Sequence, residues 1–267
     1  MTKVSTITPC YNMGRYIEGF LDNVSKQTHE DLEIVLDHND PTEAEVKLVE
    51  EHNEKYDNIF HIQVEGVDPI GISMNRCIEN ATGDYLCIWN VDDLRTPDSI
   101  EVMAKALDDN PDVDIVYGNY IIVSKFGETV GQSVDIKPYI PELKTGMILG
   151  PFFMFRKSLI EKSGVFDEQL IQGPDYDLAL RLVRNGKAHF MPDNLGYYLN
   201  EGLGMSTKPD SKQPLERTAI ELRYNVRVLD NSLVQLAKDT YDLDNIIIDE
   251  EKTLDAVKKL HTIFDLD

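Results

Sequence analysis

The chain has 267 residues, 42% of them apolar, which is enough for one large α/β domain or for one domain with a smaller appendage. Its formal net charge of −22 argues against general nucleic-acid binding, because Lys and Arg hold phosphate backbones, and disfavours an anionic membrane surface unless a local basic patch docks there. No long uncharged apolar stretch predicts a membrane span, and no secretory signal precedes the first candidate strand, so we expect a cytoplasmic protein.

Short strand-like runs alternate with helix-like periodicity in the first half of the chain, which is typical of an α/β domain with a largely parallel sheet. Strands are predicted at 4–8, 32–36, 59–64, 84–91 and 114–123. Helices are predicted around Ile17, Phe20, Leu21 and Val24, which share one helical face, and at 73–81 and 96–107.

Residues 40–43 (DPTE) predict the start of a further helix. Asp40 can cap this helix, Pro41 suits its first position, and Glu43 can close a capping box. The pair Thr96 and Pro97 repeats the pattern of a cap followed by proline.

The pattern changes after residue 123. Residues 124–150 predict a hairpin or loop region, because Gly and Pro recur there. Residues 152–168 predict a strand and a short helix, and residues 175–186 predict a helix that Gly186 closes. A polar linker then leads to helical segments predicted near 215–239 and 249–264.

Two further features concern packing and partners. Leu222, Val226 and Leu229 lie on one helical stripe, which fits packing onto the domain or onto a partner such as a second copy of the chain. The three cysteines, Cys10, Cys77 and Cys87, are odd in number and lack metal-ligand spacing, so we interpret them as small buried residues.

Unusual residues follow three of the predicted strands. They are "TPCYN" at 8–12, "DHND" at 37–40 and "NVDD" at 90–93. Because ligands bind at the carboxyl ends of strands in open α/β sheets, the convergence of these three segments predicts a ligand site.

Asp92 and Asp93 stand directly after a buried strand, although their charges repel each other. Two carboxylates beside a diphosphate are the usual protein share of a Mg²⁺ or Mn²⁺ site, and a bound cation would offset both charges. The alternative is that Asp93 belongs only to the turn that leads into the helix near Thr96.

Three residues near the first two strand ends are candidates for nucleotide contacts. Tyr11 can stack on a nucleobase, or it is a half-buried packing residue. Pro9 has no N–H for a ladder, so the first strand is predicted to end there. Asp37 is predicted to end the second strand, where it can accept a hydrogen bond from a ribose or a base; otherwise it begins the turn into the next helix.

Asp175 opens the helix predicted at 175–186. It can serve as the helix cap, with Asp177 favourable to the helix dipole in the first turn. A carboxylate held at a helix start beside a pocket can also take the proton from an attacking hydroxyl.

Three blocks in this order resemble the family 2 glycosyltransferases with the GT-A fold. They are "VSTITPCYNMGRYIEGFLDNVSKQTHEDLEIVL", "CIENATGDYLCIWNVDDLRTPDSIEVM" and "FRKSLIEKSGVFDEQLIQGPDYDLALRLVRNG". The first resembles the opening strand, Pro-x-Tyr-Asn turn and second strand of the family, the second its Asp-x-Asp metal motif, and the third its acceptor-side segment. The resemblance spans roughly residues 3 to 205.

The resemblance implies a Rossmann-like, mostly parallel sheet flanked by helices, with a GT-A domain at 1–206 and a helical C-terminal extension at 207–267. Within the domain, a nucleotide-binding half covers about 1–123 and an acceptor-side half about 124–206. The implied reaction moves a sugar, with inversion and with Mn²⁺ or Mg²⁺, from a nucleotide sugar to a glycan or lipid-linked acceptor. A UDP-sugar is slightly favoured as the donor.

The site residues that the resemblance implies fall into three groups. Asp175 is the catalytic base, and Asp93 and Asp92 hold the metal. The nucleotide-binding set is Pro9, Tyr11, Asn12, Asp37, Asn75, Asn90 and Asp92.

Several positions depart from the family pattern. His38 and Asn90 stand where the family has acids, Met74 stands where many members have Arg, and Pro174 replaces the acid before Asp175. Leu199 and Glu201 occupy positions where the family tends to have Arg and His.

Three alternatives to a glycosyltransferase remain open. Asn90, Met74 and Pro174 favour a degenerate GT-A domain that binds a nucleotide or glycan without turnover, whereas the retained Asp92, Asp93 and Asp175 favour an active enzyme. A sugar nucleotidyltransferase would need a Gly-rich basic loop after the first strand, and "PCYNMGRY" has one Gly and one Arg. A Rossmann dehydrogenase is disfavoured because no G-x-G-x-x-G follows a strand.

Overall fold

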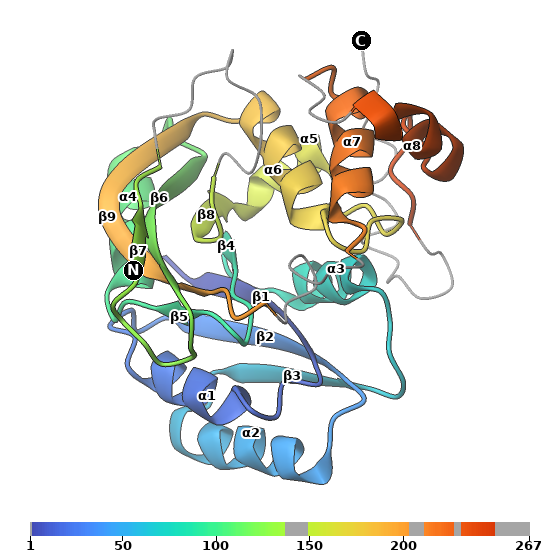
Figure 1. The fold of residues 1–267 in the computed structure, drawn as a ribbon. Coiled ribbons are helices and arrows are strands. Elements are labelled where there is room, and N and C mark those ends of the chain that lie inside the picture. Colours follow the sequence, from blue (N-terminus) through green and yellow to red (C-terminus); the bar gives the residue numbers. More distant parts are fainter. Residues whose placement is uncertain (1, 137–148, 203–210, 227–230, 249–267) are drawn as a thin grey trace.

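The computed structural model describes residues 2–136, 149–202, 211–226 and 231–248. One mixed sheet crosses the protein in the order β3-β2-β1-β4-β8-β6-β9-β5, with β7 paired to β6 (Figure 1). Its first four strands are parallel, and they are β3 (Ile59–Val64), β2 (Leu32–Asn39), β1 (Val4–Tyr11) and β4 (Tyr85–Ile88). The carboxyl ends of these four strands therefore lie along one edge.

The other half of the sheet mixes both directions. Its strands are β8 (Phe153–Arg156), β6 (Ile115–Val123), β9 (Ala188–Leu199), β5 (Leu94–Arg95) and β7 (Gln132–Val134). Strand β8 runs antiparallel to both β4 and β6, whereas β6 and β9 are parallel. Strand β7 folds back onto β6 as a hairpin, as predicted for the start of 124–150, and residues 137–148 lie outside the described residues.

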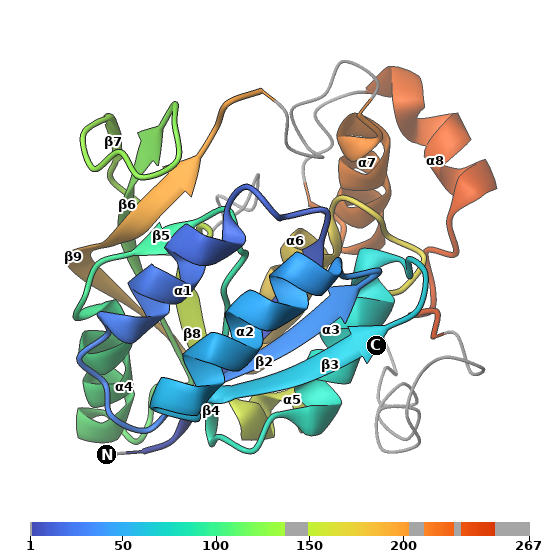
Figure 2. The same ribbon diagram turned by 90° about the horizontal axis from the view of Figure 1, so that it is seen from below.

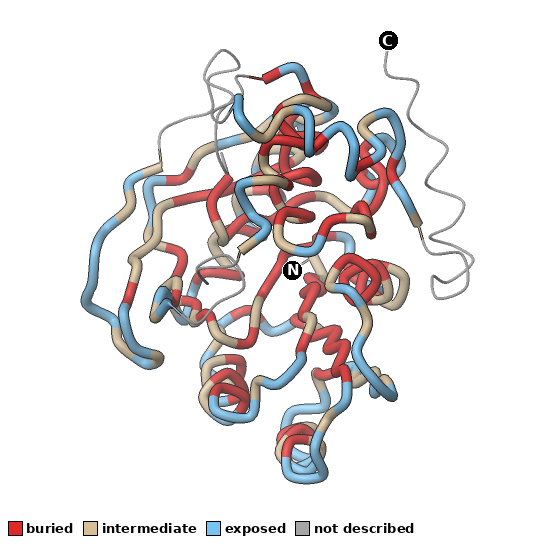
Figure 3. Tube along the Cα trace, turned by 45° about the vertical axis from the view of Figure 1, so that its right-hand side comes forward, coloured by how far each residue is buried: buried red, intermediate tan, exposed pale blue. Residues whose placement is uncertain are grey.

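Helices cover both faces of the sheet, as Figures 1 and 2 show. One face carries α1 (Ile17–Ser25), α2 (Glu43–Tyr56) and α4 (Ser99–Asp109), and the other carries α3 (Ile70–Asn80), α5 (Ile160–Ser163) and α6 (Pro174–Asn185). Side chains alternate between the faces, so that Ile34 and Leu36 pack with the first group and Val35 with the second. Figure 3 shows the resulting buried interior. The predicted fold class is confirmed.

Three cysteines lie in this interior. Cys10, Cys77 and Cys87 are free and buried, which confirms their interpretation as packing residues. Among the described residues, no helix is both long and apolar enough to cross a membrane.

The predicted helix starts were misplaced. Thr42 caps α2 in a capping box with Glu45, because Asp40 takes a left-handed conformation (φ 48°) and hydrogen-bonds through its N–H to Val64. Helix α4 begins at Ser99, two residues after Pro97. Helix α6 begins at Pro174 with Gly173 at the cap position, so Asp175 does not cap it.

The end of α6 also differs from the prediction. Gly186 follows the helix, but it is extended (φ −136°) rather than left-handed. Its position is explained by crowding, because a Cβ there would meet Leu159 at 2.8 Å and Asp114 at 2.9 Å.

The described part of the C-terminal region is largely helical, and it packs against α6. It comprises α7 (Gln213–Arg223), the 3₁₀ turn η3 (Asn231–Leu233) and α8 (Val234–Thr240). Val226 is buried in a cluster with Leu170 and Leu180 of the acceptor-side half, and Leu222 packs against that cluster. These two residues of the apolar stripe are therefore covered within the chain; Leu229 and the helix predicted at 249–264 lie outside the described residues.

Candidate active site

The first strand continues past Pro9 to Tyr11, contrary to the prediction. The N–H of Val4 donates to the backbone oxygen of Asp31, on the side of β1 that faces β2. Because backbone N–H groups alternate sides along a strand, the nitrogen of Pro9 faces β4. The pairing of β1 with β4 ends at Ile7, and no donor is missed at Pro9. Strand β1 thereby delivers Tyr11, which is 50% exposed, to the carboxyl edge of the sheet.

Asn12 turns the chain from β1 toward α1. Its backbone is left-handed (φ 55°), a conformation that Asn tolerates better than most residues. Asn12 and Tyr11 are both exposed at this turn.

Asp37 is fully buried within β2, which continues to Asn39 and does not end at Asp37 as predicted. Arg76 of α3 binds both its oxygens, with Nε at 2.7 Å from Oδ2 and Nη2 at 3.0 Å from Oδ1. Asn39 (2.6 Å) and Ser73 donate to the same carboxylate, and Asp68 binds Arg76 at 2.7 Å. A bidentate guanidinium thus occupies the oxygens that sequence reasoning assigned to a base or ribose.

Asn75 is also fully buried, and its amide faces the chain itself. Its Nδ2 donates to Phe166 O (3.0 Å) and Glu168 Oε1 (2.7 Å), and its Oδ1 accepts from Phe166 N–H (2.9 Å). Asn75 therefore ties α3 to the segment that leads toward α6.

Asp92 and Asp93 follow β4 at the same edge as Tyr11 and have different surroundings. Asp92 is partly exposed, whereas Asp93 is only 3% exposed. Asp93 Oδ1 accepts from the N–H of Leu199 (3.0 Å), and its Oδ2 accepts weakly from the Asn90 amide (3.4 Å). Asp93 thus joins the β4 turn to the end of β9, and Asp92 is the more accessible carboxylate.

Both carboxylates have raised pKa values. Burial, followed by the charge of Asp92, raises the pKa of Asp93 well above its ordinary range. Burial also raises the pKa of Asp92, with Glu201 adding to the shift. The negative charge of this pair is therefore costly when no cation is nearby.

Trp89 and Arg95 support the turn that carries these aspartates. The indole N–H of Trp89 donates to the backbone oxygen of Asp93 (3.0 Å). Arg95, 1% exposed, donates to Ile88 O (2.8 Å) and lies 5.3 Å from the Trp89 ring. Sequence reasoning overlooked Arg95, whose only signal was its position directly after "VDDL".

Glu201 follows β9 and contacts the turn after β1. Its carboxylate binds Arg15 (2.6 Å) and accepts a hydrogen bond from Tyr16. Burial and Glu201 raise the pKa of Tyr16 to about 12. The charge of Glu201 therefore acts on Asp92 together with that of Asp93. In the sequence, Glu201 was treated only as a departure from a family pattern.

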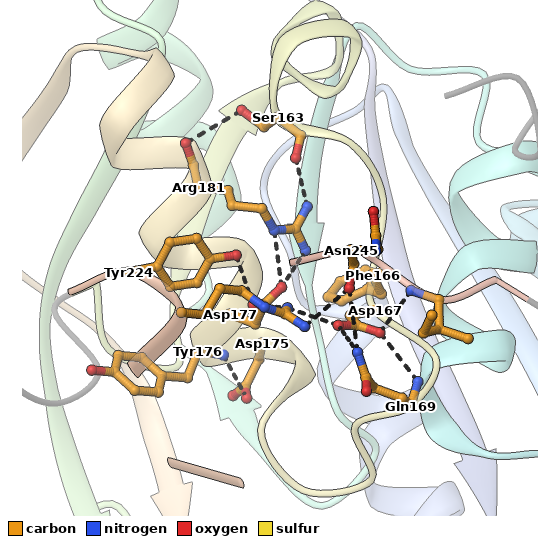
Figure 4. A network of polar contacts seen from close by, with 12 residues as sticks. Ser163, Phe166, Asp167, Gln169, Asp175, Tyr176, Asp177, Arg181, Tyr224 and Asn245 are labelled. Carbon is orange, nitrogen blue, oxygen red and sulfur yellow. Dashed lines mark hydrogen bonds and ion pairs between the residues drawn. The ribbon is translucent and has the colours of Figure 1, made fainter. Parts of the chain in front are cut away.

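Asp175 lies at the second position of α6. Its Oδ1 accepts from the N–H of Tyr176 (2.8 Å), as Figure 4 shows. Burial raises the pKa of Asp175, and the charge of Glu216 adds to the shift. None of its hydrogen bonds among the described residues reaches Asp92 or Asp93.

Asp177 points into a buried ionic network (Figure 4). It binds Arg181 at 2.6 Å, Arg223 at 2.8 Å and Tyr224 at 2.8 Å, and Arg223 also binds Asp167 at 2.7 Å. Burial alone would raise the pKa of Asp177, but the two guanidinium groups hold it below its ordinary value. The prediction that Asp177 serves the helix dipole missed this network.

The buried charge of Asp93 leads to a prediction about stability. Because the folded pKa of Asp93 lies above its unfolded value of about 3.9, the contribution of Asp93 to the stability of the metal-free protein should fall as pH rises from about 4 through the folded pKa. Asp93→Asn removes the charge and should raise the free energy of unfolding at pH 7 by about 1 kcal/mol or more. Urea unfolding at pH 4 and pH 7 measures both values, with the exposed Asp98→Asn as control. A destabilised Asp93→Asn protein at pH 7 would refute the expectation.

The mixed, mostly parallel sheet with helices on both faces is the arrangement of the GT-A fold, which solved structures described below share. The model of glycosyl transferase family 2 matches residues 5–164, more than half of the chain, so the chain belongs to this family. This assignment confirms the family resemblance.

Relatives and solved structures agree with the family. An uncharacterised glycosyltransferase of Methanocaldococcus jannaschii is 28% identical over 192 residues, covering 68% of this chain and 65% of the relative. A chondroitin synthase of Pasteurella multocida is 27% identical over 187 residues, which are 69% of this chain and 19% of the synthase. The chain thus spans less than two thirds of the length of either relative.

Two solved structures share the fold. TarS of S. aureus in complex with UDP-GlcNAc has a TM-score of 0.68 and 23% identity, covering 88% of this chain and 70% of that one. The mannosyltransferase PcManGT of Pyrobaculum calidifontis, in complex with GDP-Man and Mn²⁺, has a TM-score of 0.61 and 21% identity, covering 83% and 62%.

Proposed function

We propose that this protein transfers a sugar from a nucleotide sugar to a hydroxyl of a glycan or lipid-linked acceptor, with inversion and with help from a divalent cation. The observation that carries the proposal is the pair Asp92 and Asp93 at the carboxyl edge of β4, with pKa values raised by burial. Perturbed carboxylates at the ends of parallel strands are typical of ligand sites in α/β folds.

The donor set fits Mn²⁺ or Mg²⁺. Such ions bind through one or two carboxylates plus substrate phosphates, so a complete protein cage is not required. This agrees with the described residues, in which no group of three or more His, Cys, Asp or Glu side chains is arranged to hold a metal by itself. We assign the metal chiefly to Asp92, the accessible member, with Asp93 behind it fixing the turn. When bound, the cation stabilises the charge on the leaving diphosphate.

The remaining nucleotide contacts follow from the edge of the sheet. Tyr11 offers an exposed ring for the base, Pro9 lies in the strand that leads to it, and Asn12 sets the turn that follows it. Asn90 lies beside Asp92 and can hydrogen-bond a ribose hydroxyl. We propose that Asp37 and Asn75 support the nucleotide site indirectly from the interior, because their polar atoms are bound to Arg76 and to Phe166.

Asp175 takes the proton of the acceptor hydroxyl in this proposal. The N–H of Tyr176 donates to one of its oxygens and fixes the carboxylate. Deprotonation raises the nucleophilicity of the acceptor oxygen, which then attacks the anomeric carbon from the side opposite the leaving diphosphate and inverts it. In the corresponding domain division, residues 1–206 carry the reaction and residues 207–267 form the extension.

Equilibrium binding tests the metal and donor assignment. Mn²⁺ should strengthen the binding of UDP, and to a lesser extent of GDP, to the wild-type protein. Asp92→Asn should weaken Mn²⁺-dependent binding by at least about 10- to 100-fold, since losing even an outer partner of a metal ligand costs that much. Calorimetry with Asp98→Asn as the control measures this. Equal Mn²⁺-dependent affinity in Asp92→Asn and wild type would refute the assignment.

A further inference from the structure

Glu216 is a fully buried carboxylate on the first turn of α7. It accepts three backbone hydrogen bonds from the segment just before α6. The donors are the N–H groups of Ile171 (3.0 Å), Gln172 (2.7 Å) and Gly173 (2.9 Å). A residue of the C-terminal extension thus binds the entry to the helix that carries Asp175.

The entry to α6 depends on this contact. Gly173 occupies the cap position without a side chain, and Pro174 at the first helical position has no N–H to satisfy. The two elements also approach closely, since a Cβ on Gly173 would lie 3.0 Å from Ile220 of α7. The N–H of Gly173 is buried and would be costly to leave unpaired, so Glu216 holds the three-residue segment in one conformation.

We propose that Glu216 is a positioning residue for the transfer reaction. It fixes the backbone of residues 171–173 and thereby the carboxylate of Asp175, two residues further along. This inference rests on the proposed role of Asp175 as the base. It assigns a part of the C-terminal extension, which lies outside residues 5–164 of the family match, to the acceptor side of the reaction.

The electrostatic surroundings of Asp175 provide a specific readout. On α6 itself, Asp177 is turned to Arg181 and to Arg223 of α7. From α7, the charge of Glu216 raises the pKa of Asp175. The phenol of Tyr241, which follows α8, contacts Glu216 at 3.4 Å. Removing the charge of Glu216 should therefore lower the pKa of Asp175 and move the acid limb of its titration to lower pH.

The experiment compares Glu216→Gln and Glu216→Ala with wild type. In Glu216→Ala, amide exchange at Gln172 and Gly173 should accelerate about tenfold or more, because hydrogen bonds to a charged acceptor are lost. In Glu216→Gln, the carboxyl titration of Asp175, assigned by NMR from the signal missing in Asp175→Asn, should shift to lower pH. The turnover number should fall about 10- to 100-fold in either variant, with the Michaelis constant of the donor unchanged.

Glu221→Gln is the matched control. Glu221 is a buried carboxylate on the same helix, and its carboxylate binds Arg217. It should leave the exchange at 171–173 and the titration of Asp175 unchanged even if it lowers the melting temperature. An unshifted Asp175 titration in Glu216→Gln, or a change of equal size in Glu221→Gln, would overturn the inference. A fully active Asp175→Asn protein would instead refute the base assignment, and the positioning role with it.

Discussion

Asp175→Asn should reduce sugar transfer by about 10²- to 10⁴-fold, the usual contribution of a general base. The amide oxygen of Asn can still accept from the N–H of Tyr176, so the local fold should persist while the proton acceptor is lost. Donor binding should be unchanged, because none of the described hydrogen bonds of Asp175 reaches Asp92. Steady-state kinetics with an acceptor, alongside nucleotide binding, measures both quantities.

The pH dependence of transfer is a second test of Asp175 as the base. The base works when ionised, so activity should fall as pH drops through the pKa of Asp175. Burial places that pKa above the ordinary value for Asp of about 3.9. The exposed Asp193→Asn is the control and should behave as wild type. An Asp175→Asn enzyme with wild-type rate and pH profile would remove Asp175 from the mechanism.

Arg223→Met should lower the free energy of unfolding by about 3–5 kcal/mol, the usual cost of removing one partner from a buried ion pair. Arg223 binds Asp167 at 2.7 Å and Asp177 at 2.8 Å, and both aspartates are fully buried. Without the guanidinium, two carboxylates face each other in the interior. Urea unfolding of the variant measures the loss.

The pH dependence of this loss follows from Asp177. Its folded pKa is lowered, so its contribution to stability is present above the unfolded value of about 3.9 and is lost as pH falls through the folded pKa. The defect of Arg223→Met should therefore be largest at neutral pH, and adding Asp167→Asn should restore part of it. Lys105→Met, in an exposed pair with Asp109, should have little effect on the free energy of unfolding. A loss that small in Arg223→Met would contradict the account.

The sequence predicted the sheet, its helices and the carboxyl edge because these depend on local periodicity. The predicted ends of the first strand at Pro9 and of the second at Asp37 were wrong, because both depend on residues that are distant in sequence. Strand β1 passes Pro9 because the pairing with β4 has already ended, and β2 passes Asp37 because Arg76 satisfies the buried charge. Neither fact is visible in the residues that surround the strand end.

The acceptor side was harder to predict. The spacing of Asp177 and Arg181 indicates a helical pair, but nothing local shows that Arg223 completes it. Glu216 stands in a sequence that predicts an ordinary amphipathic helix, although its carboxylate is directed at the backbone of 171–173. The family resemblance predicts a role for Asp175, and the contacts around its helix become visible only in the fold.

The most direct test of the central claim is release of nucleoside diphosphate from a panel of UDP- and GDP-sugars, with Mn²⁺ and after chelation. We predict metal-dependent release for at least one donor by the wild-type protein, and its loss in Asp92→Asn but not in Asp98→Asn. No metal-dependent turnover with any donor in the presence of glycan acceptors, or undiminished turnover in Asp92→Asn, would contradict the account.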